Sequence, residues 1–152
     1  MVTLAGAMST AEIGKSLAPA VREQRVHAIC CTGANLEEEL FGLFSRSGYE
    51  GIPNWRHQSK EEDAALHDRG MNRVTDVAIP ETAFTGVGEK MLSLWEESEA
   101  VGDSRFPHEY VYDLVLHGGI EFSSPPEESW LVAAADANLP IFTPGWEDST
   151  LG

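Results

Sequence analysis

The stretch Cys31-Thr32-Gly33-Ala34-Asn35-Leu36-Glu37-Glu38-Glu39 follows an apolar run and decides which class of fold the chain adopts. We expect the apolar run to form a buried strand that breaks at Gly33. A helix is predicted to follow, with Asn35 as its N-cap and the glutamates in its first turn. Strand-to-helix turns with backbone N–H groups and acids at their mouth hold ligands in α/β proteins. The stretch therefore predicts an α/β fold and a candidate ligand site.

The neighbouring segments alternate between strand and helix patterns. Short apolar runs predict strands at residues 2–8 and 26–32, and a third short strand at residues 139–143. Ser9 and Glu12 have the spacing of a capping box, which predicts a helix between the first two strands. The order β-α-β-α indicates a parallel sheet with right-handed crossovers, flanked by helices.

The middle of the chain is less regular and carries several helix signals. Residues 47–58 are rich in glycine, proline and aromatic residues and predict a surface loop. Ser59 and Glu62 form a second capping box, which predicts a short helix that ends at Gly70. Further helices are predicted from Pro80 to Gly102, from Pro107 to Gly118 and over residues 126–138.

Two features indicate that residues 1–152 are one incomplete domain, part of a larger one. Three short parallel strands cannot cover their own edges. Residues 146–152 resemble a turn that enters a helix, with Asp148 or Ser149 as its cap and no helix after it.

Acidic residues dominate the charge, with 25 Asp and Glu against 10 Lys and Arg and a net charge of −15. This balance argues against nucleic acid as a partner and would attract a cationic small molecule or a basic protein. The alternative interpretation is that the negative charge only keeps the protein soluble. Cys30 and Cys31 lie in an apolar run and are interpreted as buried hydrophobic residues, which suits a reducing cytoplasm. No apolar run approaches the ~20 residues of a membrane span, so no membrane partner is expected.

Three turns follow the three predicted strands, at residues 6–10, 32–38 and 144–148. Because the carboxyl ends of parallel strands share one edge of a sheet, the polar groups of these turns are expected to converge on one crevice. Small residues and a helix N-terminus suit a phosphate or ribose there, whereas acids suit a hydroxyl or an amine. For Glu37 and Glu38 the alternative is a structural role at the start of the helix.

Other catalytic patterns are missing from the sequence. No G-x-G-x-x-G is present, and no G-x-S-x-G marks a nucleophilic serine. His108-Glu109 lacks the second histidine of a zinc-binding H-E-x-x-H, because Tyr112 stands in its place. We therefore expect no metal site.

The same turns carry a resemblance to the deoxyhypusine synthase family, in particular to its bacterial branch. The match runs through the whole chain in order. The segments that carry it are residues 3–12 (TLAGAMSTAE), 31–38 (CTGANLEE), 72–76 (NRVTD), 79–81 (IPE), 106–110 (FPHEY), 129–130 (SW) and 140–152 (PIFTPGWEDSTLG).

The resemblance implies a Rossmann-like fold and an enzyme that oxidises spermidine with NAD. An enzyme lysine captures the resulting imine as diaminopropane leaves. The aminobutyl group then passes to a protein lysine or to another amine, and the same cofactor returns the hydride. The site is implied to lie at a subunit interface, usually in a homotetramer. Glu37 and Glu38 are implied to face the polyamine, which a doubly acidic turn would attract. The residues implied to hold NAD are Gly6, Ala7, Met8, Ser9, Thr10, Thr32, Gly33, Ala34, Glu38 and Asp148.

The chain also departs from the pattern of the family, whose proteins are much longer. The family's catalytic lysine and its polyamine-binding histidine and tryptophan would follow Gly152. Lys15, Lys60 and Lys90 lie on predicted helices and are interpreted as surface charges. We therefore expect a cofactor-binding half without a catalytic residue, acting with the missing half or in an oligomer. Alternatives are a non-catalytic partner subunit, a nucleotide- or polyamine-binding module and, within the enzyme class, a homospermidine synthase.

Overall fold

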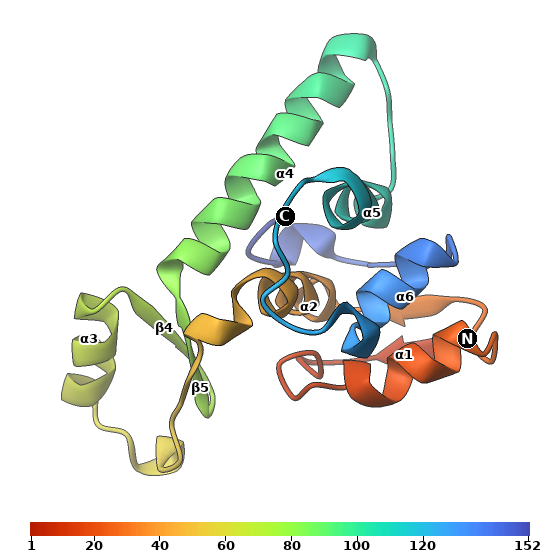
Figure 1. Cartoon of the computed structure of the whole chain (residues 1–152). Helices are drawn as coiled ribbons and strands as arrows, with labels where there is room; N and C mark the ends of the chain where they lie inside the picture. Colours follow the sequence, from red (N-terminus) through yellow and green to blue (C-terminus); the bar gives the residue numbers. More distant parts are fainter.

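The computed structural model describes residues 1–152 as a main sheet with helices around it and a smaller sheet set to one side (Figure 1). The strands are β1 (Val2–Leu4), β2 (Ile29–Cys31), β3 (Glu50–Gly51), β4 (Met71–Val74), β5 (Val77–Pro80) and β6 (Ile141–Phe142). The α-helices are α1 (Gly14–Arg22), α2 (Gly33–Ser45), α3 (Lys60–Asp68), α4 (Glu81–Val101), α5 (Pro107–His117) and α6 (Trp130–Asp136). Single 3-10 turns span Arg46–Gly48, Trp55–His57, Pro126–Glu128 and Trp146–Asp148.

The main sheet is parallel, in the order β1-β2-β6. Ile29 in the central strand β2 pairs with Val2 on one side and with Ile141 on the other. The predicted α/β class and the parallel sheet are therefore confirmed. The strands are shorter than the apolar runs that predicted them, because the ladder ends where the chain leaves the sheet for the turns.

The hydrophobic core lies between the main sheet and its helices. Helix α1 packs against α6, α6 against α5, and the long α4 against both α2 and α5. The largest fully buried side chains include Trp130, Phe41 and Leu36. Phe41 of α2 meets Phe84 of α4 edge to face, with ring centroids 4.8 Å apart. The core therefore holds α2, the helix of the candidate site, from several sides.

The first two helices, α1 and α2, start differently from the prediction. The capping box of Ser9 and Glu12 does not form: α1 begins only at Gly14, and Glu12 has a left-handed φ of 59°. The N-cap of α2 is Thr32, not Asn35, because the Thr32 hydroxyl accepts the N–H of Asn35 at 3.2 Å. As a result α2 begins at Gly33 and its first turn holds no acid. The glutamates lie in the second turn.

The other helix signals mostly hold. The capping box of Ser59 and Glu62 forms, α4 ends at Gly102 with a φ of 69°, and α5 begins at Pro107. The helix predicted over residues 126–138 is shorter, since Pro126–Glu128 forms a 3-10 turn and the Ser129 hydroxyl caps α6.

The smaller sheet was not predicted. It is antiparallel, in the order β3-β5-β4, and β4 and β5 form a hairpin whose turn includes Thr75 with a φ of 56°. Together with α3 it stands apart from the helices of the main sheet in Figure 1, and α4 continues directly from β5. The sequence pattern missed β5 because Pro80 was interpreted as the first turn of a helix, whereas it ends the strand and caps α4.

Candidate functional site

The buried side chain of Asn35 joins the turn after β1 to the first turn of α2. Asn35 is fully buried, and its Oδ1 accepts the N–H groups of Met8 at 2.9 Å and Ser9 at 3.3 Å. Its Nδ2 donates to the carbonyl of Gly6 and to the hydroxyl of Thr32, both at 2.7 Å. The end of β1 and the start of α2 therefore form one hydrogen-bonded unit.

The turn after β6 reaches the same place. A Cβ added at Gly33 would lie 2.6 Å from the Cβ of Ser149, so the two segments approach as closely as a glycine allows. The carboxylate of Glu37 accepts the N–H groups of Thr150 at 3.1 Å and Leu151 at 2.9 Å. The turns after the parallel strands β1, β2 and β6 thus meet at one place on the edge of the sheet, as the sheet order predicts. We call this meeting place of the three turns the rim.

The three consecutive glutamates of α2 point in three directions, because successive residues on a helix are about 100° apart. Glu37 is 4% exposed and faces the turn after β6, and Glu39 is 9% exposed and faces the start of α6. Glu38 is the least buried of the three. Glu37 is expected to face a polyamine, and each of its oxygens accepts one backbone N–H group in this arrangement.

Glu38 points toward the turn after β1. Its carboxylate accepts a hydrogen bond from the Thr10 hydroxyl. Burial raises the pKa of Glu38, the bond from Thr10 opposes this rise, and the charge of Glu37 adds to it. Glu38 is thus the carboxylate of α2 with the best access to the rim.

Glu39 joins α2 to the start of α6. Its Oε1 accepts the Ser129 hydroxyl at 2.8 Å and the N–H of Trp130 at 3.1 Å. Burial raises the pKa of Glu39 to about 7, although these hydrogen bonds act in the opposite direction. Helix α1 also begins here: a Cβ at Gly14 would lie 2.4 Å from the carbonyl of Glu128 and 3.1 Å from Oε1 of Glu39.

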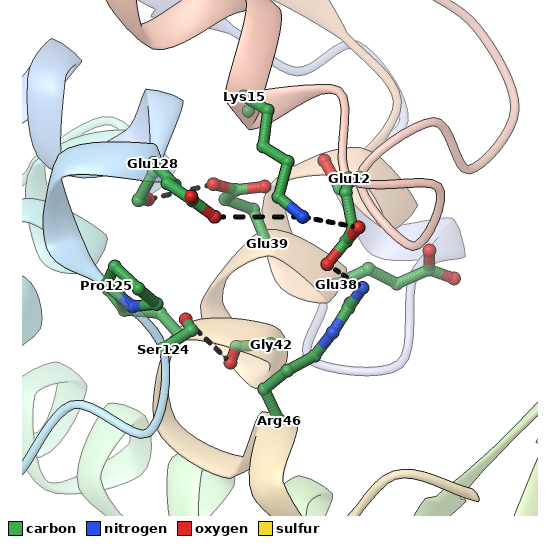
Figure 2. A pocket seen from close by; sticks show the side chains of 13 residues that line it. Glu12, Lys15, Glu38, Glu39, Gly42, Arg46, Ser124, Pro125 and Glu128 are labelled. Carbon is green, nitrogen blue, oxygen red and sulfur yellow. Dashed lines mark hydrogen bonds and ion pairs between the residues drawn. The ribbon is translucent and has the colours of Figure 1, made fainter. Parts of the chain in front are cut away.

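A small polar cavity of about 50 Å³ lies beside Glu38 and Glu39 (Figure 2). Leu43 is the one hydrophobic residue among the 13 that line it. Its two cationic side chains are paired: Lys15 lies 2.8 Å from Glu12 and 3.8 Å from Glu128, and Arg46 lies 2.7 Å from Glu12. This volume holds a few water molecules but not a dinucleotide, for which ~300 Å³ or more is usual.

The residues predicted to hold NAD fall into three groups by exposure. The side chain of Ser9 faces the core, because its hydroxyl accepts the indole N–H of Trp130 at 3.1 Å. It is therefore not available at the rim. Gly6, Ala7, Met8 and Asp148 are exposed; Thr10, Thr32, Ala34 and Glu38 are half-buried; Ser9 and Gly33 are buried.

Sequence reasoning missed the roles of Asn35 and Glu39. Asn35 was interpreted as a helix cap, and Glu39 was grouped with its two neighbours. One signal was available, because Thr32 is itself a good N-cap residue and stands three positions before Asn35. No comparable signal pointed to Glu39, since its partners lie far along the chain.

The remaining chemically active residues form no second centre. No group of three or more His, Cys, Asp or Glu side chains is arranged to hold a metal ion. Cys30 and Cys31 are free thiols, and burial raises the pKa of Cys31 to about 12. His108 is buried and its Nδ1 lacks a partner.

None of the helices has both the length and the apolar character that crossing a bilayer demands.

Known proteins resemble this chain in sequence along its whole length. The sequence model of the deoxyhypusine synthase family matches residues 1–152. The protein named "Probable deoxyhypusine synthase 2" from Methanosarcina mazei is 28% identical over 156 residues, which cover 100% of this chain and 41% of that protein. "Probable deoxyhypusine synthase 1" from Archaeoglobus fulgidus is 28% identical over 151 residues, which cover 99% of this chain and 45% of that protein.

A solved structure supports the fold. The solved structure titled "Crystal Structure of a putative deoxyhypusine synthase from Entamoeba histolytica" matches with a TM-score of 0.60 and 16% sequence identity. The match covers 99% of this chain and 42% of that one. This chain thus spans less than half the length of the proteins it matches here.

Proposed function

The chain belongs to the deoxyhypusine synthase family, and we propose that it is the NAD-binding part of an enzyme that transfers an aminobutyl group from spermidine to a protein lysine or another amine. The observation that carries this proposal is the meeting of the turns after β1, β2 and β6 at the first turn of α2. Since the chain spans less than half of its relatives, the activity, the substrates and the partners all belong to the proposal.

The rim has groups that suit NAD. The N–H groups of Gly33 and Ala34 lie in the first turn of α2, where a helix leaves its N–H groups without internal partners and favours an anion such as a pyrophosphate. Gly6 and Ala7 expose their backbone beside it. Asp148 is exposed after β6, and a carboxylate at this edge suits the hydroxyls of a ribose. NAD, when bound, would accept a hydride from the amine substrate.

Glu38 is the acid best suited to the amine. It is less buried than Glu37 and Glu39, and a nearby cation would favour its ionised form and so lower its raised pKa. The net charge of −15 adds a general attraction for a polyamine. Glu37 is 4% exposed and already accepts two N–H groups of the turn after β6, so it is less accessible to the amine.

The lysine that the reaction needs is proposed to come from outside residues 1–152, from a further segment or another subunit. Lys15, Lys60 and Lys90 are exposed on helices. The pKa of Lys15 is raised by its bond to Glu12, whereas a nucleophilic lysine needs a lowered pKa. We propose a homo-oligomer in the cytoplasm as the working form.

The same observation about lysines favours a second candidate function. A chain whose three turns meet and whose Lys15, Lys60 and Lys90 lie exposed on helices would suit a non-catalytic partner subunit, or a nucleotide- or polyamine-binding module. Product formation separates this role from the first. Release of diaminopropane with NAD and spermidine, when a lysine-bearing partner is added, supports the enzyme.

Calorimetric titration tests the proposed site directly. NAD is expected to bind saturably to the chain, or to the chain with its co-purifying partner, and Asp148→Asn to weaken NAD about tenfold, which corresponds to ~1.4 kcal/mol. Glu38→Gln is expected to weaken spermidine by a similar factor. Glu121→Gln, an exposed glutamate far along the sequence from the rim, serves as the control for charge. No heat from NAD or spermidine in either preparation would refute the proposal.

A further inference from the structure

Asn35 uses both the acceptor and the donor of its side-chain amide. As an acceptor it holds two consecutive backbone N–H groups, those of Met8 and Ser9. As a donor it reaches two oxygens, the carbonyl of Gly6 and the hydroxyl of Thr32. All of this happens at a side chain with 0% exposure. Asn35 therefore acts on the turn after β1 without being reachable by a ligand.

The turn has a shape that depends on these bonds. Gly6 has a left-handed φ of 63°, and its carbonyl receives both the Asn35 amide and the Thr32 hydroxyl at 2.7 Å. Since the Asn35 amide also donates to Thr32, the three groups form a closed ring of hydrogen bonds. Without the amide donor, the Gly6 carbonyl would keep only the hydroxyl of Thr32.

We propose that Asn35 is a positioning residue for the cofactor. It holds residues 6–10 in the conformation that exposes Gly6 and Ala7 at the rim and sets Thr10 against Glu38. It also engages the N–H groups of Met8 and Ser9, which are therefore not free to bind an anion. This inference rests on the proposed function, because only a bound cofactor gives the conformation of the turn a role.

Two substitutions separate the two roles of the amide. Asn35→Ala removes every side-chain bond. Asn35→Asp keeps the acceptor for Met8 and Ser9 but sets a carboxylate oxygen against the oxygens of Gly6 and Thr32, in place of a donor. When the pH is low enough to protonate this Asp, its O–H becomes a donor again. Asn35→Asp should therefore regain part of its function as the pH falls.

The experiment measures NAD affinity by calorimetry and amide hydrogen exchange by NMR for the wild type, both variants and Asn54→Ala. Asn54 is an exposed asparagine whose side chain caps no helix, so its variant is the matched control. In Asn35→Ala we expect NAD to bind about tenfold to 100-fold more weakly. The amides of Met8 and Ser9 should exchange faster by a similar factor, while those of α5 keep their rates.

The outcomes distinguish this inference from the proposed function. If the wild type binds NAD and both Asn35 variants bind it equally well, Asn35 is only structural and the inference fails, while the proposed function stands. If the wild type does not bind NAD, both fail. If Asn35→Ala does not fold, Asn35→Asp decides: its NAD affinity relative to the wild type should improve at low pH, and a constant ratio would overturn the inference.

Discussion

Glu39 should make the stability of this protein depend on pH. Its carboxylate is 9% exposed and lies between α2 and α6, where the Ser129 hydroxyl and the N–H of Trp130 bind one of its oxygens. These bonds favour the ionised form, but burial outweighs them and raises the pKa of Glu39 to about 7. The folded protein therefore keeps the proton of Glu39 at a pH where the unfolded chain has already lost it.

The size and sign of the effect follow from this pKa. The pKa rises from 4.5 to about 7, and one pKa unit is worth about 1.4 kcal/mol. Ionisation of Glu39 therefore lowers the free energy of unfolding by about 3 kcal/mol. Below about pH 4.5 the carboxyl of Glu39 is protonated in both the folded and the unfolded state. The free energy of unfolding is then not lowered by a buried charge at Glu39. As the pH rises toward and through 7, the unfolded state binds fewer protons than the folded state and the free energy of unfolding falls.

Glu39→Gln isolates this contribution. Its amide oxygen can still accept from Ser129 and Trp130, but it carries no charge at any pH. The free energy of unfolding of Glu39→Gln should equal that of the wild type near pH 4.5 and exceed it by up to about 3 kcal/mol at pH 8. Urea denaturation followed by tryptophan fluorescence measures both, because Trp130 is fully buried.

The control removes one carboxylate from an exposed position. Glu121→Gln changes the net charge of −15 by the same amount as Glu39→Gln, so it reports the general effect of charge on stability. If Glu39→Gln and the wild type give parallel curves of unfolding free energy against pH, the burial of an unfavourable charge at Glu39 is refuted.

Three further substitutions probe the contacts that build the rim. Gly33→Ala adds a Cβ only 2.6 Å from the next segment, so it should lower the free energy of unfolding by about 1–3 kcal/mol, whereas Gly86→Ala, the same change where no atom lies within 4 Å, should raise it by up to ~1 kcal/mol. Equal effects in urea denaturation would contradict the close approach. Glu37→Gln loses an acceptor for a backbone N–H and should cost about 1–3 kcal/mol, with faster amide exchange confined to residues 149–152; exchange that quickens throughout the chain would argue against this local role. Trp130→Phe removes the bond to Ser9 and should cost ~1 kcal/mol or more in thermal or urea unfolding, and an unchanged stability would mean that the indole N–H is dispensable.

Local patterns in the sequence were enough to predict the main sheet and the meeting of its turns. Short apolar runs gave the parallel strands, and the shared carboxyl edge of such strands then brought the turns together. The capping box at Ser59 and the helix end at Gly102 also depend only on neighbouring residues, and both formed. Predictions of this kind succeed because the deciding contacts lie within a few residues.

The directions of the three glutamates depended on contacts that no local pattern encodes. Glu39 meets Ser129 across 90 positions of sequence, and Glu37 meets Thr150 across 113. Their environments are set by how α6 and the turn after β6 dock on α2. The sequence was thus enough to predict an acidic segment, but not to predict which of its acids remains available to a ligand. The capping box of Ser9 and Glu12 failed for a related reason, since residues 8 and 9 are held instead by Asn35.

Strand β5 belongs to two cores at once, with Ala78 in the small cluster of Leu66 and Met71 and Ile79 in the main core. Because side chains alternate along a strand, a one-residue slip against β4 would drive Ile79 into the space of an alanine and leave a void beneath α4. The hairpin turn at residues 75–76 therefore acts as a fixed spacer. We expect insertions and deletions to be tolerated in the loop before α3. Inserting or deleting a single residue in the turn at residues 75–76 is expected to disrupt both hydrophobic cores together.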